Sequence, residues 1–161
     1  HGISAKMGGL NRVWINPWFE GALINSIVTQ PKLTLLFDGG CPLCQREVSF
    51  LRSRDFSNSI SFVDIDSPNY DPVLYCGISY REAMGRIHAI TSSGEVLKDV
   101  RVFREAYRLV GLGWVYAPTT WPVLGSLVDE IYRLWARWRL SFTRRPSLDQ
   151  LCKDRKLDKE P

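Results

Sequence analysis

An apolar run that leads straight into a pair of cysteines constrains this chain more than any other feature. Residues 33–37 (LTLLF) precede an aspartate, two glycines and the segment 41–44 (CPLC). A short apolar run between a proline and a glycine pair is typical of a buried strand. After it, apolar residues recur at near-helical spacing as far as about Arg54, and a proline suits the first turn of a helix. The sequence therefore predicts a buried strand, a tight loop and a helix that begins at the cysteines.

The remaining chain alternates between strand-like and helix-like patterns. Residues 60–66 predict a second strand, and residues 86–98 predict a hairpin with a glycine in its turn. A capping box that starts at Ser79 predicts a short helix, and longer helices are predicted over about 99–111 and 122–140. This order of elements favours an α/β sandwich.

Length and composition favour a single domain with two peripheral ends. The chain has 161 residues, 45% of them hydrophobic, and no apolar run long enough to cross a bilayer, so it should bury one compact core. We assign residues 31–146 to this domain. Residues 1–30 are interpreted as an N-terminal arm derived from cloning or from processing. Residues 147–161 are interpreted as a C-terminal tail in which one last helical turn is expected.

Three chemical roles are open to Cys41 and Cys44. A structural disulfide between them would close a loop too short to remove much entropy from the unfolded chain. A zinc site normally needs four ligands, so two more would have to come from residues that are not spaced as a second pair. Those residues are His1, Cys76, His88 and Cys152. Redox chemistry is therefore favoured, with zinc binding kept as an alternative.

The position of the two cysteines at a helix start suits a redox-active dithiol. Residues three apart face the same side, and their Cα atoms can approach within the roughly 4.4–6.8 Å that a disulfide tolerates. Unpaired N–H groups and the helix dipole should lower the pKa of Cys41, whereas Cys44 lies one turn inside the helix and should be better shielded. We therefore expect the more exposed Cys41 to attack a substrate disulfide and Cys44 to resolve the mixed disulfide. No cofactor is expected, because the cysteines carry the electrons.

The segment LLFDGGCPLC resembles the Asp-x-x-Cys-x-x-Cys motif of the DCC family of predicted thiol-disulfide oxidoreductases. Residues 84–118 and 131–148 are similar to downstream segments of that family, especially in members from cyanobacteria and plant organelles, and the resemblance spans about residues 33–151. It implies a thioredoxin-like sandwich, with a central mixed sheet flanked by helices, to which this chain adds a C-terminal helical segment. The motif residues, which the resemblance makes catalytic, are Asp38, Cys41 and Cys44.

The expected substrate is a disulfide in a protein or in a small molecule, and nucleic acid is not expected as a partner. Pro42 and Leu43, between the cysteines, and His88, in a later strand, are candidate substrate contacts. Thioredoxins place a cis-proline before that later strand, where it helps to position the partner chain. Here the residues REAMG precede the strand, so the usual thioredoxin mode of substrate binding lacks its proline.

Cysteine content and the amino end of the chain indicate the compartment. Four cysteines are too few for the disulfide framework of a small secreted domain. Residues 1–30 contain no basic region followed by a continuous apolar stretch, so no intact secretory signal is recognised. We therefore expect a reducing compartment, either a bacterial cytoplasm or the interior of a plant-type organelle such as a chloroplast or mitochondrion, and not secretion.

Asp38 and His88 each have a structural and a functional interpretation. The Asp38 carboxylate can accept backbone N–H bonds and merely shape the loop before Cys41. Alternatively it lies near Cys44 and takes the proton that Cys44 loses when it attacks the mixed disulfide. His88 is either a half-buried histidine bonded to its neighbours or a proton carrier close to the dithiol.

The last third of the chain combines tryptophan with arginine, and much of the net charge of +4 arises there. Trp135 and Trp138 share a helix face with Leu127 and Ile131, so we expect that face to belong to the core. The arginines expected on a solvated edge are Arg133, Arg137 and Arg139. The alternative is a non-enzymatic binding module, in which this basic aromatic helix docks an acidic partner and its binding weakens with salt.

Overall fold

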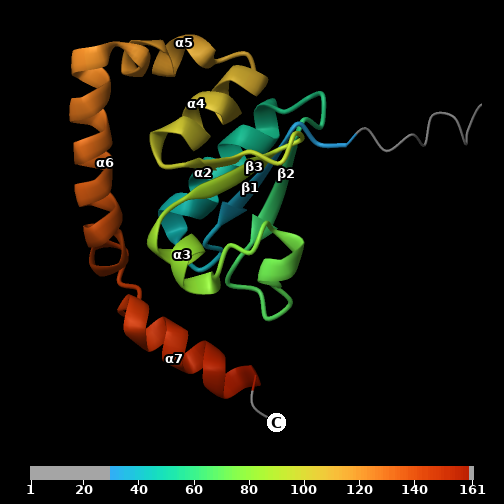
Figure 1. Cartoon of the computed structure of the whole chain (residues 1–161), viewed down its shortest axis with the longest axis vertical. Helices are drawn as coiled ribbons and strands as arrows, with labels where there is room; N and C mark the ends of the chain where they lie inside the picture. Colours follow the sequence, from blue (N-terminus) through green and yellow to red (C-terminus); the bar gives the residue numbers. More distant parts are fainter. Residues whose placement is uncertain (1–29, 160–161) are drawn as a thin grey trace, which may run out of the picture.

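Four strands form one mixed sheet at the centre of the molecule (Figure 1). The computed structural model describes residues 30–159. The strands lie in the order β2-β1-β3-β4, with β1 parallel to β2 and antiparallel to β3, which is antiparallel to β4. Their bounds are Leu33–Phe37 (β1), Ile60–Asp64 (β2), His88–Thr91 (β3) and Val96–Lys98 (β4). The predicted α/β class with a central mixed sheet is therefore confirmed, and the arrangement agrees with a thioredoxin-like fold.

Helices pack on both faces of this sheet. Residues of α2 and α4 belong to one buried cluster, and residues of α3, α6 and α7 belong to the other. The bounds are Pro42–Arg54 (α2), Tyr80–Gly85 (α3), Val100–Leu109 (α4), Gly113–Tyr116 (α5), Pro122–Phe142 (α6) and Leu148–Lys159 (α7), with 3-10 turns at Pro72–Leu74 (η1) and Ala117–Thr120 (η2). The sheet is thus a layer between two apolar clusters.

Strand β1 contributes to both clusters because its leucines alternate between the two faces of the sheet. Leu33 and Leu35 pack with α2 and α4, and Leu36 packs with α3 and the ends of α6 and α7. All three side chains are almost completely buried. Full burial on both faces explains why this strand reads as a continuous apolar run.

Local sequence signals explain the element boundaries. The predicted capping box is present, since the Ser79 hydroxyl accepts the Glu82 N–H and the Glu82 carboxylate accepts the Ser79 N–H. Gly94 occupies the hairpin turn with a φ of +86°, which favours glycine. Strand β2 ends two residues earlier than predicted, because the Asp64 carboxylate accepts the N–H of Asp66 and starts a turn there.

The predicted core role of the tryptophan face of α6 is wrong. Helix α6 runs along one side of the domain (Figure 1), and Leu127, Ile131 and Trp138 are each more than half exposed. Trp135 is also exposed. The side that faces the domain instead carries Tyr132, whose ring packs edge-on against Phe103 of α4, and the buried pair Arg139 and Leu140. A helix with two apolar sides does not reveal from its spacing which side packs inward.

The segment assigned to the C-terminal tail forms more structure than one helical turn. Helix α7 extends over twelve residues, and the Ser147 hydroxyl accepts the N–H of Gln150 at its start. Leu151 of α7 is buried in the cluster that contains Leu36. None of the helices in residues 30–159 is long and apolar enough to span a membrane.

Candidate active site

The loop between β1 and α2 is held at the carboxyl end of the sheet. The Asp38 carboxylate accepts the Gly40 N–H at 3.0 Å, and the Asp38 carbonyl accepts the Cys41 N–H at 3.1 Å. The Gly39 N–H donates to the Asp64 carboxylate at the end of β2, at 2.9 Å. A Cβ atom on Gly39 would overlap that carboxylate, and one on Gly40 would overlap the guanidinium of Arg145. The two glycines are therefore required by close packing.

The two cysteines are in direct contact at the start of α2. Cys41 is the N-cap residue, and the Cys44 N–H donates to the Cys41 Sγ at 3.4 Å. Both thiols are free. Cys41 has no exposed surface and Cys44 is partly exposed, so the expectation that Cys41 is the more exposed cysteine is wrong. The reason is that the chain after α6 packs over the loop before Cys41, with Arg145 lying against Gly40.

Arg139 of α6 contributes a buried positive charge to the cysteine pair. Its Nη1 atom donates to the Cys44 Sγ at 3.2 Å, and its Nη2 atom donates to the Met84 carbonyl. The side chain is buried, so the prediction of a solvated edge is wrong for this arginine. The available signal was its position on α6, since Arg139 and Leu140 lie on the side opposite to the exposed apolar residues.

The environment shifts the pKa values of the two thiols in opposite directions. The pKa of Cys41 is lowered to about 6, chiefly by the hydrogen bond from the Cys44 thiol and also by the Cys44 N–H and the charge of Arg139. Burial and the Asp38 carboxylate oppose this shift. The pKa of Cys44 is raised, because its proton is bonded to Cys41 and because it is buried. The predicted lowering for Cys41 is confirmed, although its largest cause is the second cysteine.

Asp38 is buried and joined to two arginine-linked carboxylates. Arg145 donates to the Asp38 Oδ1 at 3.0 Å and also pairs with Asp66 at 3.2 Å. The Asp38 Oδ2 is buried, and it has no hydrogen-bond partner within the described part of the chain. Oδ1 thus shapes the loop, as the structural interpretation predicts, while Oδ2 retains an unused acceptor.

His88 lies at the start of β3 and is bonded to its own segment. Its Nδ1 atom is 2.8 Å from the Arg86 carbonyl, which can only accept, so Nδ1 carries the hydrogen. Burial lowers the pKa of His88. Pro42 and Leu43 are exposed on the first turn of α2. The proposed roles of these three residues in substrate binding stay predictions.

Tyr132 of α6 is another residue that the sequence did not single out. Burial raises the pKa of its hydroxyl, and a hydrogen bond from the Ile87 N–H partly offsets that shift. Ile87 directly precedes β3, which is the place where thioredoxins carry their cis-proline. The C-terminal helical segment therefore meets the dithiol side of the domain at both Tyr132 and Arg139.

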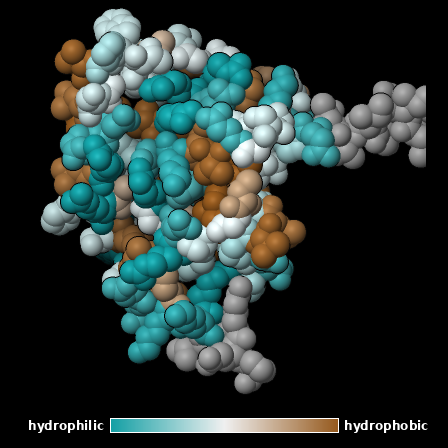
Figure 2. Space-filling model, in the orientation of Figure 1, coloured by the Kyte–Doolittle hydropathy of each residue, from teal (hydrophilic) through white to brown (hydrophobic). Residues whose placement is uncertain are grey.

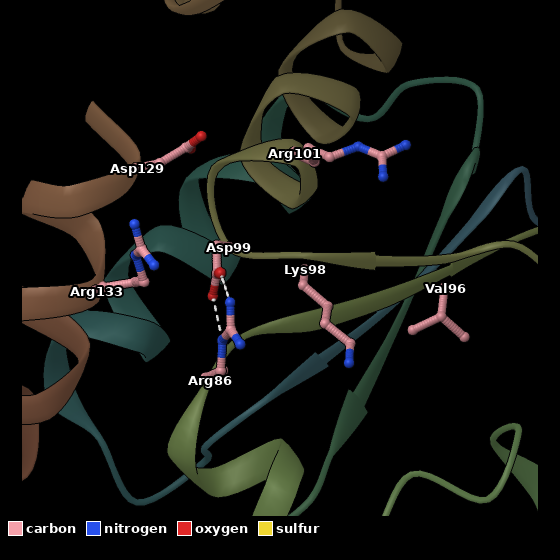
Figure 3. Close-up of a pocket in the computed structure, with 7 residues that line it drawn as sticks. All are labelled: Arg86, Val96, Lys98, Asp99, Arg101, Asp129 and Arg133. Carbon is pink, nitrogen blue, oxygen red and sulfur yellow. Dashed lines mark hydrogen bonds and ion pairs between the residues drawn. The ribbon is translucent and has the colours of Figure 1, made fainter. Parts of the chain in front are cut away.

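Two other kinds of site were considered. Residues 30–159 contain no group of three or more His, Cys, Asp or Glu side chains that could hold a metal ion. A pocket of about 390 Å³ lies where charged side chains from β4, α4 and α6 converge, next to the Arg86–Asp99 ion pair (Figure 3). Neither Asp38 nor the cysteines line this pocket, which makes it separate from the dithiol.

A mixed sheet with two cysteines at the start of the helix after its central strand defines a dithiol protein of thioredoxin-like class. The profile of the DCC1-like thiol-disulfide oxidoreductase family matches residues 35–145, and the chain belongs to this family. An Arabidopsis thaliana protein, described by its name as uncharacterised and chloroplastic, is 47% identical over 129 residues. The alignment covers 80% of this chain but only 60% of that protein. No solved structure gives a significant match.

Substitution of Arg145 by glutamine (Arg145→Gln) is expected to destabilise the protein by about 3 kcal/mol, because it leaves a buried carboxylate without its partner charge. The measurement is the free energy of unfolding from urea denaturation. Arg101→Gln is the matched control, since Arg101 pairs with Glu95 in an exposed ion pair. The control should change the same free energy by less than about 1 kcal/mol. Equal effects of the two substitutions would contradict a buried network.

The ultraviolet absorbance of the thiolate should show that one cysteine of the reduced protein titrates near pH 6. Cys41→Ser should remove this step. Arg139→Met removes a positive charge that favours the thiolate, so the midpoint should move to higher pH. Arg133→Met, at an exposed arginine of the same helix, should leave it unchanged. A step in the wild-type protein at the ordinary value of about 9, or one indifferent to Arg139→Met, would refute this electrostatic account.

Proposed function

We propose that the protein is a dithiol oxidoreductase in which Cys41 attacks a disulfide of the substrate and Cys44 resolves the mixed disulfide. The observation that carries this proposal is the contact between two free thiols whose pKa values are shifted apart. At neutral pH the pair holds one proton, on Cys44, and Cys41 is the thiolate. Only the thiolate is an effective nucleophile toward a disulfide.

The reaction balances with the two cysteines alone. The Cys41 thiolate forms a bond to one sulfur of the substrate, and the second substrate sulfur leaves as a thiolate that takes up a proton. Cys44 then loses its proton and attacks the Cys41 sulfur, which releases the first substrate sulfur. The products are the Cys41–Cys44 disulfide and a substrate dithiol, so two electrons pass from the protein to the substrate. In the opposite direction the same steps oxidise a substrate dithiol.

Arg139 supports both steps of this mechanism. Its charge favours the thiolate form of Cys41 and of Cys44. Cys44 must become a thiolate during resolution, and the guanidinium at 3.2 Å is already in place to stabilise that charge. The bond from Arg139 to the Met84 carbonyl holds the guanidinium in position. Arg139 is therefore proposed as a catalytic residue together with the cysteines.

Access to Cys41 requires a local movement. The residue has no exposed surface, and the segment that carries Arg145 lies against the loop before it. A substrate disulfide therefore reaches Cys41 only when this segment or the loop shifts. The substrate is proposed to be a disulfide in a protein or small molecule. A plant-type organelle is the proposed location, supported by the chloroplastic relative.

Mixed-disulfide trapping tests the order of the two cysteines. A Cys44→Ser protein cannot resolve the intermediate, so it should accumulate mixed disulfides when it is incubated with a disulfide substrate or with an oxidised extract. A Cys41→Ser protein should accumulate far fewer, because the pKa of the remaining Cys44 is raised. The readout is the mass of the adducts on non-reducing gels and in peptide mass spectrometry. The reverse pattern would reverse the assignment.

Asp38→Asn tests whether the free Oδ2 atom accepts the proton of Cys44. The substitution keeps the shape and an acceptor for the Gly40 N–H, and we expect it to slow mixed-disulfide resolution severalfold near neutral pH. Arg145→Gln is the control, because it breaks the same ion pair but keeps the carboxylate. Circular dichroism establishes that both variants are folded. An unchanged rate and pH profile in Asp38→Asn would show that Asp38 only shapes the loop.

A further inference from the structure

Helix α6 presents a continuous apolar stripe to solvent along its whole length. Figure 2 shows hydrophobic residues gathered over α6 at the left edge of the molecule. The side chains of this stripe are between 55% and 88% exposed. They are Val123, Leu127, Ile131, Leu134, Trp138 and Phe142. An exposed apolar patch of this extent is a mark of an interaction surface.

The stripe is not the side by which α6 packs on its own domain. Tyr132, Arg139 and Leu140 occupy that side and contact α4, the dithiol and the second core cluster. At 100° per residue, the six stripe residues fall within one sector of about 100° on the opposite side. The helix therefore has one side that is already used and another that lacks a partner within the described chain.

The spacing of the stripe is the same in both directions. Successive members are four, four, three, four and four residues apart. If two copies of α6 pair antiparallel about a two-fold axis between Ile131 and Leu134, these two residues face each other. Leu127 then faces Trp138 of the second copy, and the two ends of the stripe also meet. A surface that matches itself after reversal is what an isologous two-fold interface requires.

The charges beside the stripe select the same arrangement. Glu130 and Arg137 directly precede two stripe residues and lie along the same edge of the stripe. In the antiparallel pair, Glu130 of each copy lies next to Arg137 of the other, so opposite charges meet twice. In a parallel pair, Glu130 would meet Glu130 and Arg137 would meet Arg137. An anionic bilayer would likewise be repelled by the acidic residues Asp129 and Glu130.

We propose that α6 is the interface of a homodimer in which two copies of this chain pair antiparallel through the stripe. Helix α6 has 21 residues and is about 30 Å long, so the contact spans six turns. Its other side holds Arg139 and Tyr132 against each dithiol domain, and the two active sites stay outside the interface. The proposal does not rest on the oxidoreductase function, because it uses no residue of the cysteine site.

Sedimentation velocity over a range of protein concentrations tests the dimer. The reduced full chain is expected to sediment as two chains, and the double substitution Ile131→Glu/Leu134→Glu as one. Val73→Glu/Leu74→Glu is the matched control, because these apolar residues of η1 are equally exposed but lie off the stripe. The control should remain dimeric. Circular dichroism and the thiolate titration check that each variant keeps its fold and its contact between α6 and the dithiol.

A charge-reversal cycle tests the antiparallel register. Glu130→Arg and Arg137→Glu should each raise the dissociation constant of the dimer by about tenfold, because each creates two like-charge contacts. The double variant should restore the wild-type value. A monomer at every concentration, a dimer indifferent to the stripe substitutions, or a cycle without restoration would overturn the proposal. A monomer that binds phosphatidylglycerol vesicles through the stripe would also overturn it and would assign the face to a bilayer.

Discussion

Strand β1 is paired on both edges and buried on both faces, and the position of the active-site loop depends on this. Because β1 cannot shift without opening two core clusters, residue 38 is fixed at the sheet edge. Bonds from the loop to Asp38 and Asp64 then place Cys41 at the N-cap of α2. The thiolate pKa and the contact between the two sulfur atoms are consequences of that fixed position.

The C-terminal segment completes the site that the sheet begins. Asp38 and the Cys41 thiolate bring two negative charges into a buried loop, and Arg139 and Arg145 supply two positive charges from α6 and the chain after it. Charge pairing of this kind is what permits ionised groups to be buried. The same segment also covers Cys41, so it both stabilises the reactive thiolate and restricts access to it. The added helices are therefore part of the proposed chemistry.

The sequence predicted the local elements well and the long-range contacts poorly. The strand at residues 33–37, the helix from Pro42 and the capping box at Ser79 depend on neighbouring residues, and all three are present. The burial of Arg139 and the exposure of Trp138 depend on which side of α6 meets the domain, and spacing alone does not decide this because both sides are apolar. The exposure of the two cysteines was predicted in the wrong order because it depends on where Arg145, more than a hundred residues away, packs.

The measurement that tests the account most directly is the redox state of Cys41 and Cys44 after equilibration in graded thiol and disulfide buffers. Alkylation and mass spectrometry then report which cysteines are bonded. The account predicts a single two-electron transition between the free dithiol and an intramolecular Cys41–Cys44 disulfide, with Cys76 and Cys152 unpaired. Failure of the disulfide to form at any reachable potential, or one tightly bound zinc ion per chain in the same sample, would contradict it.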